Sequence, residues 1–571
     1  METAEHKVNQ INSDAQKLGL RHFEDIADIE NILQKKLDAQ PQITSIEEMP
    51  DPLLFKDMEK AVDIFAEAVA GNKKICFVLD SDMDGLGCYT QTWFFFKKYF
   101  PYGNLTMTIT NRKEGYGFLP LHVDKFPADL YITADNGITA KPAVDAAKAI
   151  GAKVIINDHH LHDPEVWPLG ADAVIDPHQP DCQFPYKEVS GSVVLWYFFK
   201  AIANKYRLDI DSYNEFLGEL ALTTLSDVMP VDRHLNRFFV TDYLVNQKIK
   251  QSPRAYAQTF LETKNTDPTA EDISFGFTPL INATQRITKA DDGANFLIQE
   301  EAGQSQQWFE YLNGINDIRK ERQQKLLDYI EYRYKDYLPR KGVGGARDNL
   351  DFICIPGNFH KEYKGVLGII AGRLAEKYKK PCIVLNLNEE SGIYSGSGRS
   401  VGDINILGMF RDDDIKPLIE HVGGHKVALG IGVHKDNFDE FYKIIVGKAA
   451  GISADLFKPK VSSMGYMDIN KIDIDLYHRL QKFEPFGEKF PRPALTTRVL
   501  IKSTNLIGKQ KNHMTMVVQD VNKMLTFKAL WFFHDSVPDA GEEYYLTFKP
   551  DIDTFRGSEK LSLRVLGLEK I

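Results

Sequence analysis

The chain has 571 residues, of which 43% are hydrophobic and 26% are charged, and its formal net charge is −11. A chain of this length is expected to form roughly three or four domains, and the composition is that of a soluble globular protein. The longest apolar run, residues 189–199, is shorter than the roughly 18 residues that a membrane span needs. No signal peptide is visible at the N-terminus. These features argue against a membrane protein and against a secreted one.

The five cysteines are scattered along the chain and form no CxxC pair. This pattern disfavours a zinc ribbon or a disulfide framework and indicates a reducing compartment, so we expect a cytoplasmic protein. The acidic net charge alone argues weakly against nucleic acid. Residues 498–533, however, hold six Lys or Arg and only one acid, and an acidic protein can still carry a basic groove.

In chain order, residues 1–65 look helical and polar. From residue 75 to about 230 short apolar strands alternate with helices, which predicts a parallel, doubly wound sheet. The predicted strands include residues 75–79, 130–134, 154–156 and 173–175.

The second half of the chain reads differently. The spacing of apolar residues predicts a long amphipathic helix over 305–338, ended by Pro339. A second α/β unit follows over about 350–450, and the alternating runs of 460–571 predict a small β-barrel. We therefore expect an α/β multidomain protein with a helical extension (1–65), a first α/β domain (66–300), a connecting helix (301–340), a second α/β domain (341–455) and a barrel (456–571).

Acidic residues follow the apolar strand 75–79 at alternate positions: Asp80, Asp82 and Asp84. Like charges held this close repel each other, and a hard divalent cation would remove that cost. Three further segments carry similar side chains: 132–137 with Asp135, 155–160 with Asp158, His159 and His160, and 225–228 with Asp227. Because parallel strands deliver their carboxyl ends to one edge of a sheet, we expect all four segments to converge there.

Mixed carboxylate and imidazole ligands favour Mn²⁺ or Mg²⁺ over Ca²⁺. A carboxylate between two ions about 3.5–4 Å apart can bridge them, and such a pair suits phosphoryl chemistry. Asp135 is the candidate for the bridge. A lone Asp after a strand is usually a helix N-cap, and a lone His pair is usually structural, but four such segments together favour a metal site.

The Asp158-His159-His160 motif resembles the DHH phosphoesterase superfamily, and the chain is similar, from about Val78 to its end, to the RecJ family of single-strand-specific DNA exonucleases. Further segments that match family motifs are 111–117, 176–191, 279–286, 365–374, 396–400, 423–425 and 483–491. The sequence departs from the usual family residues at Ser81, Met83 and Thr284-Gln285, none of which is a predicted ligand.

The resemblance implies a DHH catalytic domain, a DHH-associated (DHHA1) domain and an OB-like barrel that binds single strands. It implies one cation held by Asp80, Asp82 and Asp135, and a second held by Asp84, Asp135, His159 and Asp227. His160 is expected to contact a phosphate and Asp158 to orient an imidazole, so both belong with Asp135 to the catalytic set. The expected substrate contacts are Arg112, Asn282, Arg286, Arg373, Ser397, Arg399, Gly424 and His425.

The implied activity is 5′→3′ hydrolysis of single-stranded DNA to 5′-mononucleotides with two divalent cations, Mn²⁺ or Mg²⁺, in DNA repair or recombination. One alternative is a phosphodiesterase for nanoRNA or cyclic dinucleotides, whose members lack the C-terminal barrel. Another is a non-catalytic replication scaffold, which would have lost ligands. Single-stranded DNA is the implied partner, with a single-strand-binding protein or a helicase as candidate protein partners; we expect a monomer without membrane contact.

Overall fold

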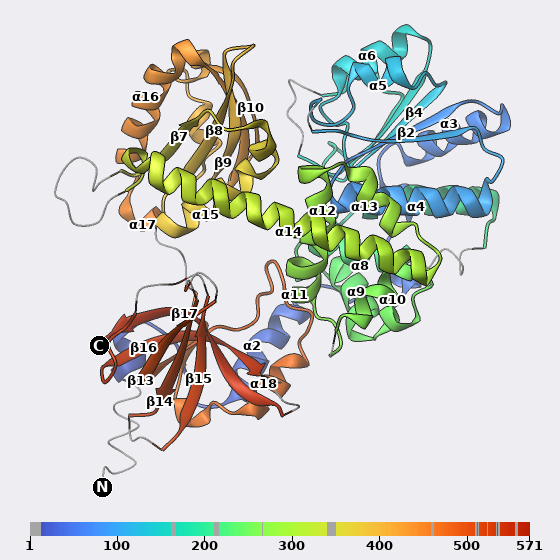
Figure 1. Cartoon of the computed structure of the whole chain (residues 1–571). Helices are drawn as coiled ribbons and strands as arrows, with labels where there is room; N and C mark the ends of the chain where they lie inside the picture. Colours follow the sequence, from blue (N-terminus) through green and yellow to red (C-terminus); the bar gives the residue numbers. More distant parts are fainter. Residues whose placement is uncertain are drawn as a thin grey trace.

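The structure is a computed structural model, and it describes residues 13–571 except 113, 162–166, 210–215, 265, 340–349, 458–461, 509–510, 512, 522–523, 533, 535–536 and 554–557. It contains three sheets, connected by helices and loops (Figure 1). Among the described helices, none is both long enough and apolar enough to cross a membrane.

The first sheet is parallel throughout, with the order β3-β2-β4-β5-β6. Its strands are β2 (Ile75–Leu79), β3 (Leu105–Ile109), β4 (Leu130–Ala134), β5 (Lys153–Asn157) and β6 (Ala173–Ile175). The chain passes from β2 to one edge and then returns to the other side, so the strand order reverses between β2 and β4. The predicted doubly wound sheet is confirmed, and ligands of such sheets bind at this switch point.

Both faces of the first sheet are covered, which explains why its central strands are apolar throughout. In β2 the side chains of Phe77 and Leu79 join one core, whereas Cys76 and Val78 join another. The first face carries α3 (Met58–Ala70), α4 (Met83–Tyr99) and α7 (Gly191–Tyr206), and the second carries α5 (Pro120–Lys125) and α6 (Lys141–Ala149).

A helical region follows and leads into one long helix. Its members are α8 (Leu217–Ser226), α9 (His234–Val240), α10 (Ala255–Glu262), α11 (Ala270–Asp272), α12 (Thr278–Ile287) and α13 (Ala290–Leu297). The helix predicted over 305–338 is α14 (Ala302–Arg333), which ends five residues earlier and gives way to a short 3₁₀ turn at Lys335–Tyr337. It packs on α10 and α12 at one end and on α15 at the other, and so joins the two α/β domains (Figure 1).

The second sheet has the order β10-β11-β9-β8-β7, and only β7 and β8 run parallel. The elements of this domain are β7 (Ile353–Gly357), α15 (Leu367–Tyr378), β8 (Cys382–Asn388), β9 (Ile393–Arg399), β10 (Ile419–His425), β11 (Ala428–His434), α16 (Phe438–Ala450) and α17 (Ala454–Phe457). Helix α15 covers one face of the sheet and α16 covers the other.

The C-terminal strands close into the predicted barrel, because β13 pairs with both β14 and β16. The closed order is β13-β14-β15-β17-β16, the arrangement of an OB fold. The elements are β12 (Gly465–Met467), α18 (Ile474–Gln481), β13 (Leu495–Ile507), β14 (His513–Gln519), β15 (Thr526–Trp531), β16 (Glu543–Asp553) and β17 (Lys560–Lys570).

The first described part of the N-terminal extension packs on the barrel, whereas its last part belongs to α3 and covers the first sheet. Strand β1 (His22–Phe23) pairs with β12, and α2 (Ile26–Asp38) lies beside α18 (Figure 1). The Tyr545 hydroxyl donates a hydrogen bond to the buried Asp14 carboxylate at 2.8 Å. These contacts tie the start of the chain to its last domain.

Candidate metal centre

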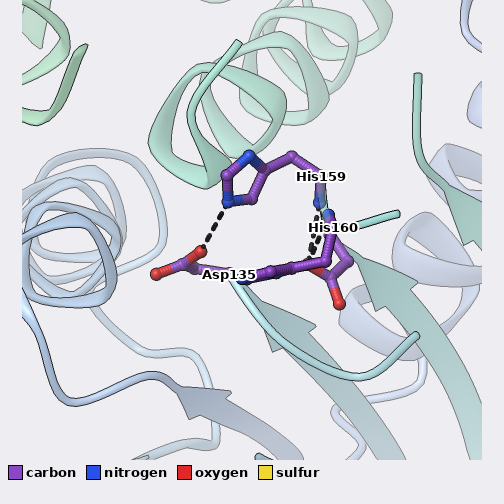
Figure 2. A group of neighbouring side chains, drawn as sticks. Asp135, His159 and His160 are labelled. Carbon is purple, nitrogen blue, oxygen red and sulfur yellow. Dashed lines mark hydrogen bonds and ion pairs between the residues drawn. The ribbon is translucent and has the colours of Figure 1, made fainter. Parts of the chain in front are cut away.

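The predicted ligands meet at the switch point of the first sheet. Asp80 follows β2, Asp135 follows β4, and His159 lies two residues beyond β5. His159 Nε2 is 3.1 Å from Asp135 Oδ1 (Figure 2). The same nitrogen is 3.6 Å from Asp227 Oδ2 and 3.9 Å from Asp84 Oδ2. Carboxylates from three other segments therefore surround one ring nitrogen.

Among the described residues the candidate ligand atoms form three overlapping groups, and within each group they lie within 4.8 Å of one another. The groups are Asp80, Asp82 and Asp135; Asp84, His159 and Asp227; and Asp135, Asp158, His159 and His160. The third group shares Asp135 with the first and His159 with the second, so these two residues link the groups. This grouping is the one that two neighbouring cations would require.

Asp227 reaches the cluster from a different kind of element than we expected. It follows α8, not a strand, and forms the C-cap of that helix. The prediction that all four segments end strands is therefore wrong for this residue, because the apolar run before it is a buried helix packed on α4. The next residue, Val228, has a φ of 54°, which is rare for a β-branched residue.

The N-terminus of α7 holds Asp84 in place. Asp84 Oδ2 accepts from the Gly191 amide at 2.6 Å, and Oδ1 accepts from the Ser192 amide at 3.0 Å. Free amides at a helix start favour a negative charge. A Cβ on Gly191 would lie 2.6 Å from the Asp135 Cβ, so only glycine lets this helix approach both carboxylates.

Asp80 and Asp82 have polar partners on the strand and loop next to them. The Thr110 hydroxyl donates to Asp80 Oδ1 at 2.7 Å. Arg112 Nη2 lies 3.1 Å from Asp82 Oδ2 and 3.8 Å from Asp80 Oδ2. Sequence reasoning assigned Arg112 to the substrate and did not identify Thr110, because nothing but its place after a strand marks it.

The electrostatics of the cluster fit a site for cations. Burial, together with neighbouring carboxylates, raises the pKa of Asp135 well above its ordinary value, that of Asp80 to about 6 and that of Asp227 to about 7. His159 Nε2 is buried and makes no hydrogen bond with any described residue. Divalent cations would offset the repulsion and give this nitrogen a partner.

His160 is held differently from His159. Its Nδ1 lies 2.8 Å from Asp158 Oδ1, and its Nε2 lies 3.3 Å from the Tyr116 hydroxyl. Burial lowers the pKa of His160 and the Asp158 carboxylate raises it, with a net upward shift. The imidazole that Asp158 contacts is thus that of His160, which favours the charged ring.

The second α/β domain brings an imidazole and a guanidinium to the same place. The His425 ring stacks on that of His160, with centroids 6.4 Å apart. His425 and Arg399 both pair with Ala428 on β11, from opposite sides, and so share one row of the sheet. Gly368 leaves the space for this arginine, because a Cβ there would lie 3.1 Å from Arg399 Nη2.

Several predicted substrate contacts gather around Arg399. Arg286 donates to the Gly365 carbonyl at 3.2 Å, and burial together with Arg112 and Arg319 lowers its pKa to about 10. Burial and Arg112 also lower the pKa of Arg399. A cluster of neighbouring guanidinium groups makes a favourable site for a phosphate. Arg319, on α14, was overlooked because the helix was interpreted only as a connector.

Other predicted contacts are placed less directly. Ser397 lies near Gly368, with 3.4 Å between its Oγ and a Cβ built there. Gly424 has a φ of 137° beside His425, and a Cβ there would lie 2.4 Å from the Ala428 carbonyl oxygen.

Two further predicted contacts are engaged with protein groups. Asn282 Oδ1 accepts from the Met83 amide at 2.8 Å. Arg373 lies against Gln323 of α14, whose amide oxygen, suitably turned, is 2.9 Å from Arg373 Nη2. Neither residue touches the carboxylates through a described hydrogen bond.

A cavity of about 790 Å³ lies elsewhere, between the helical region and the barrel. Its lining includes Phe275, Tyr477, Arg492, Lys549 and Arg564, and none of the carboxylates described above. The cluster of carboxylates and imidazoles therefore lies outside this cavity, at the switch point of the first sheet.

Comparison with known proteins gives three family matches in chain order. Residues 74–224 match the DHH family N-terminal domain, 358–450 match the DHHA1 domain, and 465–567 match the RecJ OB domain. The order and the positions agree with the three sheets described above.

Individual relatives match over most of the chain. The single-stranded-DNA-specific exonuclease RecJ of Dickeya dadantii is 28% identical, over 93% of this chain and 95% of its own length. The enzyme of the same name from Escherichia coli is 28% identical over 89% of both chains. The crystal structure of RecJ with Mn²⁺ from Thermus thermophilus has a TM-score of 0.73 at 21% identity, over 94% of this chain and 74% of that one.

Proposed function

The chain belongs to the RecJ family of DHH phosphoesterases, and from this premise we propose that it is a single-strand-specific DNA exonuclease that uses two divalent cations. The observation that carries the proposal is the meeting of three carboxylates, from three distant segments, around His159 Nε2. We assign 5′→3′ polarity and release of 5′-mononucleotides by family resemblance, with a place in DNA repair or recombination.

The donor set fits Mn²⁺ or Mg²⁺. We assign Asp80, Asp82 and Asp135 to one cation, and Asp84, Asp135, His159 and Asp227 to the other. When bound, the two cations would activate water and neutralise charge on the phosphate. The relative from Thermus thermophilus was crystallised with Mn²⁺ and with Mg²⁺, which supports the choice of metal.

The chain's own residues bind and orient the strand. The imidazolium of His160, held by Asp158, donates to a phosphate oxygen as negative charge builds there. Arg399 and His425 bind the phosphate from the second domain, and Arg112 and Arg286 do so from the first. Backbone amides at the start of α7 hold the Asp84 carboxylate in place.

A polymeric substrate is favoured over a dinucleotide by the barrel. An OB fold binds single strands through a basic groove and stacking side chains, and Lys528, Trp531 and Phe532 lie on or next to β15. A nanoRNA or cyclic-dinucleotide phosphodiesterase, the first alternative, would not need this barrel to bind its short substrate. The alternative of a replication scaffold is disfavoured because every predicted ligand is present.

The remaining assignments are proposals of the same kind. We propose the domain boundaries 66–300, 301–340, 341–455 and 456–571, with 1–65 as an extension. We further propose a monomer that acts on single-stranded DNA, with a single-strand-binding protein or a helicase as protein partner. The five free cysteines support the cytoplasm as its compartment.

The decisive experiment is a nuclease assay with Mn²⁺ on single-stranded, duplex and dinucleotide substrates, labelled at either end. We expect mononucleotides released from the 5′ end of single strands. Cleavage of dinucleotides alone would replace the proposal with the phosphodiesterase, and no turnover with any substrate would favour the scaffold.

A further inference from the structure

A hydrogen bond outside the predicted ligand set joins the first carboxylate loop to α12. The Ser81 hydroxyl donates to Gln285 Oε1 at 3.1 Å, and Ser81 is buried. Ser81 lies between Asp80 and Asp82, two of the three carboxylates assigned to one cation. The Gln285 amide therefore contacts the segment that carries both of these ligands.

A second residue of α12 contacts the same loop. Asn282 Oδ1 accepts from the Met83 amide at 2.8 Å. Residues 282 and 285 are three positions apart in a helix, so their side chains lie on the same face. One helix face thus holds both the side chain of Ser81 and the backbone of Met83.

The end of α12 also contacts the second α/β domain. Arg286 Nη1 donates to the Gly365 carbonyl at 3.2 Å, and a Cβ on Gly365 would lie 2.2 Å from the Arg286 carbonyl oxygen. The end of α12 therefore contacts the second α/β domain, while one face of α12 contacts the loop of the first α/β domain that carries Asp80 and Asp82.

The packing of the core does not account for this glutamine. Gln285 Nε2 is buried and has no hydrogen-bond partner among the described residues. A buried donor without a partner is unfavourable, and an apolar side chain of similar size would avoid that penalty. The contact that its oxygen makes with Ser81 offers a reason for keeping an amide here.

We infer that Gln285 is a positioning residue that acts through Ser81 on Asp80 and Asp82. Its hydrogen bond holds the two carboxylates in the arrangement in which they bind a cation together with Asp135. The inference rests on the proposed function, and it assigns Gln285 to cation affinity and not to the chemical step.

The test is a double-mutant cycle in the full chain with Ser81→Ala, Gln285→Leu and the double variant. Mn²⁺ binding is followed without DNA, from the paramagnetic resonance signal of free Mn²⁺. We expect each single substitution to weaken binding roughly 3- to 10-fold, the effect of losing one buried hydrogen bond. The double variant should be no weaker than the weaker single one, because both remove the same bond.

Two further variants separate positioning from packing. Gln285→Glu keeps an acceptor oxygen for Ser81 and is expected to bind Mn²⁺ at least as tightly as the unaltered chain. Gln299→Leu removes a glutamine amide whose bond is to the Asn295 carbonyl of the preceding helix, α13, and should leave binding unchanged. With saturating Mn²⁺, Gln285→Leu should keep kcat within about twofold while the half-activating Mn²⁺ concentration rises.

Several results would overturn the inference whether or not the chain cleaves DNA. One is unchanged Mn²⁺ affinity in the single variants. Another is a loss of Mn²⁺ affinity in the double variant that equals the product of the two single losses. A third is a loss of Mn²⁺ affinity in Gln299→Leu as large as that in Gln285→Leu. If Gln285→Leu does not fold, Ser81→Ala alone decides by the same binding measurement. An unaltered chain that binds Mn²⁺ but cleaves no single strand would instead refute the proposed function.

Discussion

Asp135 has a backbone φ of 60°, in the left-handed region that residues other than glycine rarely adopt. Such a conformation costs about 1–3 kcal/mol and persists only where the surrounding structure imposes it. Here it turns the chain at the end of β4 and places the carboxylate 3.1 Å from His159 Nε2. The backbone strain at Asp135, its burial and its position between two groups of candidate ligands all favour Asp135 as the carboxylate that bridges the two proposed cations.

We predict that Asp135→Ala lowers kcat by at least about a thousandfold, because it removes the one carboxylate that lies between both proposed cations. Single-strand binding, measured by fluorescence anisotropy in EDTA, should stay within about threefold, since the arginines remain. Asp145→Ala, which alters an exposed carboxylate paired with Lys141, is the matched control. Cleavage retained in Asp135→Ala would refute the two-cation site.

We propose that Arg399 contacts the DNA and not the cations. We predict that Arg399→Ala raises the Kd for a single strand about tenfold, the usual effect of losing a charge-assisted phosphate contact. It should change saturated turnover by less than about threefold, and it should reduce the salt slope of binding by roughly 0.7. Arg333→Ala, at the exposed end of α14, serves as the control. If Arg399→Ala lowers kcat more than it lowers affinity, Arg399 takes part in the chemical step.

At the scale of elements, the site depends on how closely α7 approaches the end of β4. The start of this helix gives two amides to Asp84 and leaves no room for a Cβ at Gly191. The helix terminus also stabilises nearby negative charge. The position of α7 thus orients Asp84 and limits where Asp135 can lie.

We predict that Gly191→Ala reduces kcat at least about a hundredfold, because either α7 or Asp135 must shift. Gly314→Ala is the matched control: this glycine lies within α14, where a Cβ meets nothing within 4 Å. There, alanine should leave kcat unchanged and raise stability by roughly 0.5–1 kcal/mol. Steady-state kinetics and thermal melting of both variants check these effects, and normal kcat in Gly191→Ala would contradict the proposed rigidity.

The elements were predictable to the extent that their signals are local. The strand before Asp80 is an apolar run with acids directly after it, so both strand and ligand could be assigned from residues close together in the sequence. Asp227 was assigned to the right cluster but to the wrong kind of element, because a short apolar run fits a buried helix as well as a strand. Thr110 acts only through a tertiary contact, and a single sequence carries no signal for such a contact. Gly191 ends a segment that resembles a family motif, but its approach to Asp135 could not be predicted from the sequence.

At the scale of the whole molecule, Arg237 is one of the residues that tie the barrel to the catalytic domain. Arg237 on α9 donates to three backbone carbonyls of the barrel segment, those of Phe483, Glu484 and Pro485, at 2.6–3.0 Å. Its guanidinium also lies 4.8 Å from the centre of the Phe490 ring. The same region is linked to the Asp227 side of the site, since the Val231 amide donates to the Glu488 carbonyl at 3.0 Å.

We predict that Arg237→Leu destabilises this junction by roughly 2–4 kcal/mol, because three buried carbonyls lose a charged donor at once. The loss should appear as a lower melting temperature and as faster proteolysis between α18 and β13, while short oligonucleotides are still cleaved. Cleavage of long single strands should be reduced more than cleavage of short ones, because only long strands require the catalytic domain and the barrel to be correctly positioned relative to each other. Arg333→Ala again supplies the control. Equal loss on short and long strands would mean that Arg237 stabilises the catalytic domain itself and does not set the position of the barrel.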